Sequence, residues 1–260
     1  MFYRKVTKAE VISQESLAPG IYDLRLNTPA AEFARPGQFI GIYPKDSSKL
    51  LMRPISICSA DADQKELRIV YRVTGANTGT AEFSALKPGD GVRILANLGN
   101  GFPYEEAKGK CVVLMGGGIG IPPMLGLAKS IDGDVHSFLG YRDRQTFLSE
   151  DFMKYSKVYI ATEDGSVGCK GNVLDALQTT TLKPDIIMAC GPMPMLRAIK
   201  KYAEENGIVA YISLEERMAC GVGACLGCVC KTVNKDHHSH VNNTRVCTEG
   251  PVFDSREVDI

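Results

Sequence analysis

The stretch KCVVLMGGGIGIPPMLGLAKSI, residues 110–131, joins an apolar run to a glycine loop and then to a second apolar segment that opens with two prolines. This order predicts a strand, a tight turn and a helix. Four later segments continue the pattern, three as strands and the last as a helix: VHSFLGY (135–141), KVYIAT (157–162), DIIMACG (185–191) and PMPMLRAIKKYAEENG (192–207). In the predicted helix Met195, Ile199 and Tyr202 recur at helical spacing, and Gly207 marks its end. Strands that alternate with helices predict a doubly wound parallel sheet.

The first hundred residues have a different texture, because short apolar runs alternate with Gly, Pro and Asp turns. Four runs predict strands: GIYDLRLNTP (20–29), GQFIGIYP (37–44), LRIVYRVTG (67–75) and GDGVRILANLG (89–99). Several short strands with regular turns predict a small antiparallel β-barrel. From about Ser213 glycine and cysteine dominate, and this third part is too small to bury a core without a bound group.

The length and charge of the chain narrow its function class. With 260 residues, 44% hydrophobic and 23% charged, it is long enough for two packed domains and a small module. The 30 basic and 30 acidic residues balance, which argues against a nucleic-acid partner. No apolar run approaches the roughly 20 residues of a membrane helix, and the N-terminus lacks a secretory apolar core. We therefore expect a cytoplasmic protein without a membrane partner.

Nine cysteines are unevenly distributed along the chain. Cys58, Cys111, Cys169 and Cys190 are scattered, as small buried groups usually are. The others crowd the C-terminal end, where Cys220-x4-Cys225-x2-Cys228 is followed by Cys247. This is the spacing of plant-type [2Fe–2S] sites. Three thiolates from one tight loop and a distant fourth can hold two irons, and the intervening glycines permit the close wrap.

Two alternatives concern the metal at this segment. A zinc site needs only four tetrahedral thiolates, but such sites usually carry two short Cys-x2-Cys hooks, and here there is one. Cys230 could replace Cys228 as a ligand, at the cost of the two-residue spacing. We interpret His237, His238 and His240 as a solvated loop, since four cysteines make a Rieske-type site unnecessary.

The segment Arg53-Pro54-Ile55-Ser56 resembles the R-x-[YF]-S signature of the ferredoxin-reductase family. The resemblance implies FAD, with the arginine at the pyrophosphate and the serine hydroxyl near the flavin ring. A guanidinium suits phosphate because its planar fork donates hydrogen bonds in pairs. Ile55 stands where the family has an aromatic residue. Further candidate flavin contacts are Val70, Tyr71 and Arg72 on the next strand, and Gly79 and Thr80 at a helix N-terminus that suits an anion.

A second cofactor segment is Gly116–Gly120, which resembles the G-x-G-I-x-P stretch of the same family. At Gly117, Gly118 and Gly120 the missing side chains would let a pyrophosphate approach the backbone amides. Cys190 and Gly191 follow a strand at its carboxyl end, where α/β sheets bind ligands. In the family such a turn lies near the nicotinamide, although Cys190 could also be a buried strand-end thiol.

The choice between NAD and NADP depends on the segment Thr162–Gly165, which also ends a strand. A carboxylate of Glu163 or Asp164 could bind a ribose diol and repel a 2′-phosphate, which favours NAD. Arg142 and Arg144 nearby argue for the opposite choice.

The motifs RPIS, GGGIGIPP, CGPMPML, ERMACGVGACLGC and CTEGPVF follow one another in this order. Together they resemble the electron-transfer subunit family of NAD-linked dihydroorotate dehydrogenases over almost the whole chain. The resemblance implies an antiparallel FAD-binding barrel (1–102), an NAD-binding domain with a doubly wound parallel sheet (103–212) and a small [2Fe–2S] module (213–260). It also implies an FMN-containing catalytic partner, in a heterotetramer of two subunits of each kind.

The resemblance further implies a path for electrons in pyrimidine biosynthesis. Electrons from dihydroorotate would pass from the partner's FMN through the cluster and FAD to NAD⁺. The cofactors carry this chemistry, so we assign no general acid or base. The main alternative is a subunit of a ferredoxin–NAD(P) reductase, sulfide reductase or hydrogenase, which share these motifs. A redox-sensing module and a zinc-stabilised interaction domain are more distant alternatives.

Overall fold

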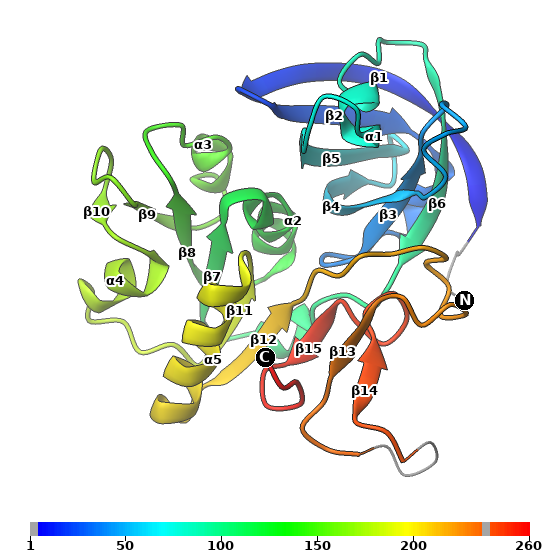
Figure 1. Ribbon diagram of the computed structural model, residues 1–260. Helices are drawn as coiled ribbons and strands as arrows, with labels where there is room; N and C mark the ends of the chain where they lie inside the picture. Colours follow the sequence, from blue (N-terminus) through cyan, green and yellow to red (C-terminus); the bar gives the residue numbers. More distant parts are fainter. Residues whose placement is uncertain (1–4, 236–239) are drawn as a thin grey trace.

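Six strands close into an antiparallel barrel in the computed structural model, which describes residues 5–235 and 240–260 (Figure 1). Around the barrel the strand order is β1–β2–β5–β4–β3–β6. Alternate side chains point inward and form an aliphatic core. The short helices η1 (Pro29–Phe33) and α1 (Gly79–Phe83) add buried residues to this core. The strands are β1 (Val6–Ala18), β2 (Ile21–Asn27), β3 (Phe39–Tyr43), β4 (Arg53–Asp61), β5 (Glu66–Arg72) and β6 (Gly91–Leu98).

The second part is a seven-stranded sheet of order β10–β9–β8–β7–β11–β12–β15. Its first six strands run parallel, and β15 pairs antiparallel with β12 at the edge. The strands are β7 (Cys111–Gly117), β8 (Asp134–Tyr141), β9 (Lys157–Thr162), β10 (Cys169–Lys170), β11 (Ile186–Cys190), β12 (Val209–Ser213) and β15 (Val252–Asp254).

Helices cover both faces of this sheet, as a doubly wound fold requires (Figure 1). In β7, Val112 and Leu114 pack on one face and Val113 and Met115 on the other. The first face also receives α2 (Ile121–Ser130) and α3 (Ser149–Phe152), and the second receives α4 (Val173–Gln178) and α5 (Met193–Asn206). Two 3-10 turns, η2 (Tyr104–Ala107) and η3 (Gly118–Gly120), precede β7 and α2. The barrel and the doubly wound sheet confirm the predicted fold class.

The predicted helix at residues 192–207 is α5, but its buried stripe differs from the prediction. Leu196, Ile199 and Ala203 are buried, whereas Met195 and Tyr202 are only partly buried. Gly207 ends the helix in a left-handed conformation, with φ of 64°, which glycine adopts without strain. Ile199 belongs to both sets, so the buried stripe is rotated by roughly 65° from the face that Met195, Ile199 and Tyr202 define.

The C-terminal segment is attached to the sheet at both ends. Ser213, the last residue of β12, pairs with Val252, the first residue of β15. Between them lies the cysteine-rich loop, followed by a small antiparallel pair, β13 (Val229–Lys231) and β14 (Asn243–Arg245). The loop thus leaves the sheet and returns to a neighbouring strand, close to the barrel side of the molecule (Figure 1).

A buried ion-pair network joins the barrel to the sheet. Arg68 on β5 lies 2.7 Å from Asp23 on β2 and 3.1 Å from Asp151 on α3. The side chains of Arg68 and Asp23 are 12% and 7% exposed. Gly126 on α2 packs against the carbonyl of Cys58 on β4 so closely that a β-carbon there would clash. These contacts fix how the two larger parts face each other.

Within residues 5–235 and 240–260, no helix is both long and apolar enough to cross a membrane.

Candidate functional site

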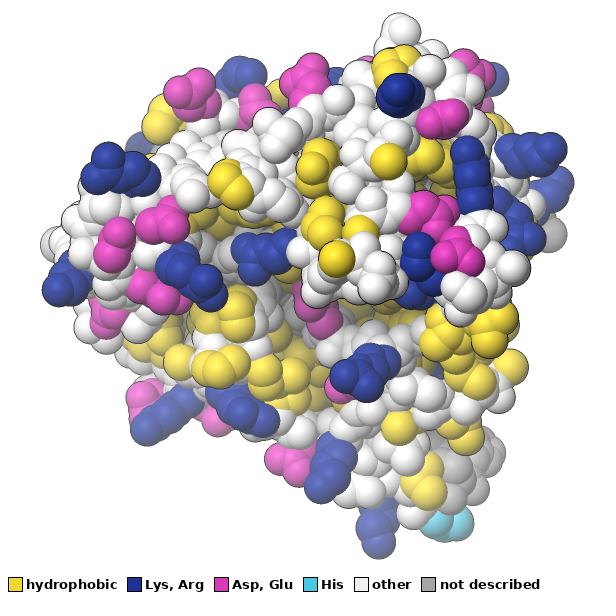
Figure 2. Space-filling model, turned by 45° about the horizontal axis from the view of Figure 1, so that its top comes forward, with side chains coloured by type: hydrophobic (Ala, Val, Ile, Leu, Met, Phe, Trp, Pro, Cys, Tyr) yellow, Lys and Arg dark blue, Asp and Glu magenta, His cyan; other side chains and the backbone are white. Residues whose placement is uncertain are grey.

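A cavity of about 1060 Å³ lies between the barrel, the glycine loop and the segment that follows β12. Binding pockets for small molecules typically measure roughly 300–1,000 Å³, so this one has room for a large cofactor. Figure 2 looks towards the hollow between the two larger parts, where hydrophobic side chains line the walls. Of the predicted cofactor-binding residues, eight border the cavity: Arg53, Pro54, Ile55, Ser56, Val70, Tyr71, Arg72 and Thr80.

Arg53 lines this cavity and packs against Gly79 at the start of α1. A β-carbon at Gly79 would lie 3.0 Å from Nε of Arg53 and 2.9 Å from Cγ of Pro44. Glycine therefore lets the guanidinium lie flat against the start of α1. Arg53 also donates a short hydrogen bond to the carbonyl of Leu51. Arg53 thus brings to the cavity wall a guanidinium, a group that pairs well with phosphate.

Thr80 borders the cavity as well, but its hydroxyl is already engaged. It accepts a hydrogen bond from the backbone N–H of Thr74 at 3.1 Å and pairs with the hydroxyl of Thr78 at 2.9 Å. Thr78 caps α1 by accepting from the N–H of Ala81. The threonine hydroxyls thus hold the turn in shape.

The side chains of Ile55 and Tyr71 lie in the barrel interior, with 8% and 2% exposed. The Tyr71 hydroxyl donates to Oε1 of Gln14 at 2.8 Å, and its ring stacks on Tyr22. Burial raises the pKa of Tyr71 far above its ordinary value. The phenol is therefore committed to the barrel core. The residue nevertheless borders the cavity, as part of the wall that the barrel forms.

The glycine loop and the Cys190-Gly191 turn lie in direct contact. A β-carbon at Gly120 would clash with the carbonyl of Cys190, and one at Gly191 would lie 3.1 Å from the N of Gly117. At Gly117 it would meet Sδ of Met195 at 2.6 Å. Only backbone fits between these two turns. Sequence-distant candidates are thereby brought together at the carboxyl ends of β7 and β11, where α/β sheets bind ligands.

The glycine loop reaches the large cavity through Ile119, whereas Gly117, Gly118, Gly120, Cys190 and Gly191 are not among its lining residues. Arg72 connects the two regions, since its Nη2 lies 3.8 Å from where a β-carbon of Gly118 would be. Cys190 is 1% exposed. Burial and the nearby Glu215 raise its pKa, against a smaller opposing effect of Ser213. Its thiol is therefore a neutral, buried group at neutral pH.

The turn Thr162–Gly165 follows β9, next to the carboxyl end of β8. Asp164 accepts a hydrogen bond from the N–H of Ser166 at 2.9 Å. Hydrogen bonds from Ser166 lower the pKa of Asp164, and Arg144 contributes to the same effect. Asp164, which favours NAD, and Arg144, which favours NADP, thus lie close together in the fold.

The four cysteines of the predicted metal site form two pairs. The thiols of Cys220 and Cys225 are neighbours, and so are those of Cys228 and Cys247. Cys220 Sγ also accepts the backbone N–H groups of Val222 and Cys225, each at 3.4 Å. Two thiolates on each of two irons are what a [2Fe–2S] cluster requires. The donor set therefore fits such a cluster.

The two pairs differ in their surroundings. Burial alone would raise the pKa of Cys220, but the N–H groups of Val222 and Cys225 lower it to about 6. Cys228 and Cys247 are buried, with 3% and 1% exposed. Burial, together with the neighbouring Cys228, raises the pKa of Cys247. The first pair lies near the surface and the second lies against the protein core.

The cysteine-rich loop packs directly on the wall of the large cavity. A β-carbon at Gly221 would clash with Cε of Met52, and Leu95 and Leu98 of the barrel lie close by. Met52 is itself a lining residue of the cavity. One side chain thus touches both the loop that carries the thiols and the space proposed for the flavin.

Cys230 is half-buried and packs against the main core cluster. Burial and Glu216 raise its pKa to about 11. His240 is exposed, and His237 and His238 lie outside the described residues. All nine cysteines are free thiols.

Residues 215–259 match the family model described as "Iron-sulfur cluster binding domain of dihydroorotate dehydrogenase B". Over 261 aligned residues, the chain is 40% identical to the "Dihydroorotate dehydrogenase B (NAD(+)), electron transfer subunit" of Listeria monocytogenes serotype 4a (strain HCC23). The alignment covers 98% of this chain and 99% of that protein. A protein of the same name from Geobacillus sp. (strain WCH70) is 38% identical, with 98% of each chain covered.

The chain belongs to the family of dihydroorotate dehydrogenase B electron transfer subunits.

The fold of this family member resembles those of solved reductase structures. The structure of the NADH-dependent reduced ferredoxin-NADP oxidoreductase, studied for flavin-based electron bifurcation, superposes with a TM-score of 0.84 at 26% identity, covering 96% of this chain and 89% of that chain. A ferredoxin NADP⁺ reductase from Neisseria gonorrhoeae, with bound FAD and NADP, gives a TM-score of 0.63 at 19% identity, with 82% and 94% covered. Family membership confirms the resemblance seen in the sequence and the expected electron-transfer role.

Some residues that line the large cavity were not predicted from the sequence. Lys49 and Met52 line it from the loop before β4, and Ser213–Met218 line it from the opposite side. Glu215 is open to solvent within this concave space, yet the surrounding protein raises the pKa of its carboxyl by desolvation. The position of this segment directly after a parallel strand was the available signal.

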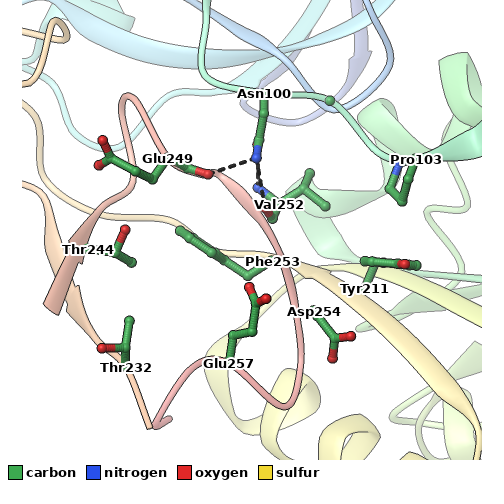
Figure 3. A pocket seen from close by; sticks show the side chains of 11 residues that line it. Asn100, Pro103, Tyr211, Thr232, Thr244, Glu249, Val252, Phe253, Asp254 and Glu257 are labelled. Atoms are coloured by element: carbon green, nitrogen blue, oxygen red, sulfur yellow. Dashed lines mark hydrogen bonds between the residues drawn. The ribbon is translucent and has the colours of Figure 1, made fainter. Parts of the chain in front are cut away.

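A second cavity, of about 420 Å³, lies where the C-terminal segment meets the sheet edge (Figure 3). The side-chain amide of Asn100 donates to the carbonyls of Glu249 at 2.7 Å and Val252 at 3.2 Å. The carboxylates of Glu249 and Asp254 already pair with Arg245 and Arg256. In this member of the electron transfer subunit family, the contacts anchor the C-terminal segment to the barrel.

Proposed function

We propose that this chain is the electron-transfer subunit of an NAD-linked dihydroorotate dehydrogenase. It would pass electrons from a catalytic partner through a [2Fe–2S] cluster and FAD to NAD⁺. The observation that carries the proposal is the position of Met52, which touches Gly221 of the cysteine-rich loop and lines the large cavity. A cluster and a flavin held at these two places would be separated by little more than one side chain.

The thiol pairs are the proposed iron ligands, Cys220 with Cys225 and Cys228 with Cys247. Gly227 has only Sγ of Cys225 near its missing β-carbon, at 3.4 Å, so the backbone there leaves space beside the thiols. Arg245 steadies the loop, because it pairs with Glu249 at 2.5 Å and donates to the carbonyl of Gly223 at 3.2 Å. The chain thus supplies both the ligands and a braced frame for them.

The large cavity is the proposed FAD site. Arg53, lying against Gly79, would bind the pyrophosphate, and Ser56 would face the flavin ring. Bound FAD would supply the exchange of single electrons on one side and of electron pairs with NAD on the other. The chain's own residues position this group, and the buried Ile55 and Tyr71 keep the barrel wall behind it rigid.

NAD⁺ would approach from the carboxyl ends of β7 and β11. The backbone of Gly117, Gly118 and Gly120 would receive its pyrophosphate, and the Cys190-Gly191 turn would lie near the nicotinamide. Glu163 or Asp164 would bind the adenosine ribose. The contact between the glycine loop and the Cys190 carbonyl supports this arrangement, because it holds both turns together at the carboxyl ends of the strands.

The remaining proposals concern the assembly. The relatives are named as electron transfer subunits, which implies a separate catalytic subunit. We propose that this subunit holds FMN and that two copies of each form a heterotetramer. Nine free thiols suit a reducing compartment, so we propose a cytoplasmic location.

The deciding experiment is to co-express the chain with its genomic neighbours and to assay NAD⁺ reduction driven by dihydroorotate. We expect NADH and orotate in equal amounts, dependent on both subunits. Reduced ferredoxin, sulfide and hydrogen serve as the competing donors. NADH formation with one of these donors, and none with dihydroorotate, would assign the chain to the other reductases.

A further inference from the structure

Three metal-binding side chains converge at the beginning of β7 and β8, at the opposite end of these strands from the glycine loop. They are Cys111, Asp134 and His136, and their donor atoms all lie within 4.8 Å of one another. Cys111 and Asp134 are register partners in the parallel pair, and His136 is two residues further along β8. Residues two apart on a strand share a face, so the three side chains stand on the same side of the sheet.

The imidazole of His136 is held in one orientation. Its Nε2 lies 3.1 Å from Oδ2 of Asp134, and its Nδ1 lies 3.4 Å from the hydroxyl of Tyr159. The ring is 2% exposed and stacks on Tyr159 at a centroid distance of 5.9 Å. In metal sites a ligating histidine usually has its second ring nitrogen bonded to a neighbouring group. Tyr159 provides such a neighbour, and Nε2 is left facing the other two donors.

Cys111 and Asp134 complete a mixed set of sulfur, nitrogen and oxygen donors. The backbone N–H of Cys111 donates to Oδ2 of Asp185 at 2.8 Å, which fixes the start of the strand. The thiol is half-buried, and the Asp134 side chain is 60% exposed. The set therefore has a rigid inner wall and an opening towards solvent.

We propose that Cys111, Asp134 and His136 bind Zn²⁺, with water as the fourth ligand. Zinc accepts thiolate, imidazole and carboxylate together, and three protein ligands with one water is a common tetrahedral set. Bonds of about 2.0–2.3 Å at tetrahedral angles place ligand atoms about 3.3–3.8 Å apart. Since the donor atoms lie within 4.8 Å of one another, they need to close by about 1.5 Å at most to meet this requirement.

The charges around the site favour a divalent cation. Asp134 and Asp185 contribute two carboxylates, and Lys157 is the neighbouring cation, 3.8 Å from Oδ1 of Asp134. On binding, the thiol of Cys111 releases its proton to solvent, and neutral His136 binds through Nε2 with its proton on Nδ1, directed at Tyr159. No electron is transferred. The site lies on the α4 and α5 face of the sheet, since Val113 and Phe138 on the same strands belong to that core.

The test measures zinc in the holoprotein, loaded with flavin and iron, after equilibration with buffered Zn²⁺ and removal of free metal. We expect one zinc per chain. Cys111→Ser and Asp134→Asn should each lower the retained zinc at least tenfold. Asp134 is largely exposed, so its substitution leaves the fold intact even if a change at buried His136 would not. Cys169→Ser, at another half-buried thiol in the same sheet, is the matched control and should retain zinc fully.

Iron analysis and the zinc absorption edge separate this site from the cysteine-rich loop. Full iron content in the same samples shows that the loop thiols are occupied. The zinc shell should contain one sulfur at about 2.3 Å and lighter atoms at about 2.0 Å. The proposal is overturned if wild-type protein retains no zinc, if Cys111→Ser retains as much as wild type, or if the shell contains four sulfurs.

Discussion

Arg68 on the barrel donates hydrogen bonds to Asp151 on helix α3 at 3.1 and 3.2 Å while it also pairs with buried Asp23. One guanidinium therefore neutralises two carboxylates that belong to different parts of the molecule. Because the flavin cavity lies between these parts, this contact sets the shape of the proposed active cleft. Burial alone would lower the pKa of Arg68, but its hydrogen bonds to Asp23 and, to a smaller extent, Asp151 raise it.

Substitution Arg68→Met should lower the free energy of unfolding by about 3–5 kcal/mol, because it leaves Asp23 buried without its partner. Urea unfolding of the whole chain measures this loss. Arg25→Met is the matched control, since the Arg25–Glu66 pair is much more exposed and should contribute below about 1 kcal/mol. Equal losses in the two variants would contradict a structural role for the buried network.

The pH dependence of stability should report on Asp151. Burial alone would raise its pKa, but hydrogen bonds from Lys154 and Arg68 lower it. Because the folded-state pKa is the lower one, the carboxylate stabilises the fold above its unfolded pKa of about 3.9. This contribution is lost as the pH falls through the folded-state pKa.

We therefore expect the free energy of unfolding to decrease less in Asp151→Asn than in wild type when the pH is lowered from about 6 to about 3. Urea titrations at several pH values give the comparison. Glu150→Gln, at an exposed position of the same helix, should follow the wild-type curve. Parallel curves for wild type and Asp151→Asn would refute the assignment.

Gly79→Ala should weaken FAD binding by roughly ten- to a hundredfold, because a β-carbon there displaces Arg53 and removes a charged hydrogen bond of about 1.5–3 kcal/mol. Flavin fluorescence during dialysis or titration measures the dissociation constant. Gly91→Ala is the matched control, since nothing lies within 4 Å of its missing β-carbon. Unchanged binding in Gly79→Ala would argue against Arg53 as the phosphate ligand.

Cys225→Ser should abolish the visible iron–sulfur spectrum and leave FAD bound, because one iron loses a ligand while the cavity is untouched. Iron and flavin contents of anaerobically purified protein give the two readings. Cys230→Ser is the matched control and should keep its iron. Loss of iron in Cys230→Ser, with retention in a Cys228→Ser variant, would instead make Cys230 the third ligand.

Gly221→Ala should lower the iron content, since its φ of 69° is a left-handed conformation and its new methyl group would push against Met52. The strain alone costs about 1–2 kcal/mol. Gly207→Ala has nearly the same φ, 64°, but open space around it. It should lose similar stability and keep all its iron, so the iron readout isolates the contact with Met52.

The sequence was sufficient for the barrel, the doubly wound sheet and the cysteine spacing, because each rests on local periodicity or on a short motif. It was insufficient for the direction of side chains. In β5 the alternation places Leu67, Ile69 and Tyr71 on the inner face of the barrel, but it does not show that Tyr71 also borders the cavity. In α5 the buried residues are Leu196, Ile199 and Ala203, so Met195 and Tyr202 lie at the margin of the buried stripe.

Contacts between distant segments were also beyond the sequence. Met52 and Gly221 are separated by most of the chain, and they meet because the cysteine-rich loop packs on the barrel. Cys111 read as one more scattered thiol until the parallel register placed it beside Asp134. Such relationships depend on strand order, which no local pattern contains.

Ser213 at the end of β12 pairs with Val252 at the start of β15, so the two ends of the cysteine-rich segment lie side by side in the sheet. The cysteine-rich segment therefore leaves the sheet and returns to it at two adjacent residues on neighbouring strands. Because insertions are tolerated where the ends of a segment lie close together, a different metal centre grafted between these two residues would meet the same flavin wall. We expect such a graft to leave the barrel and the doubly wound sheet unchanged.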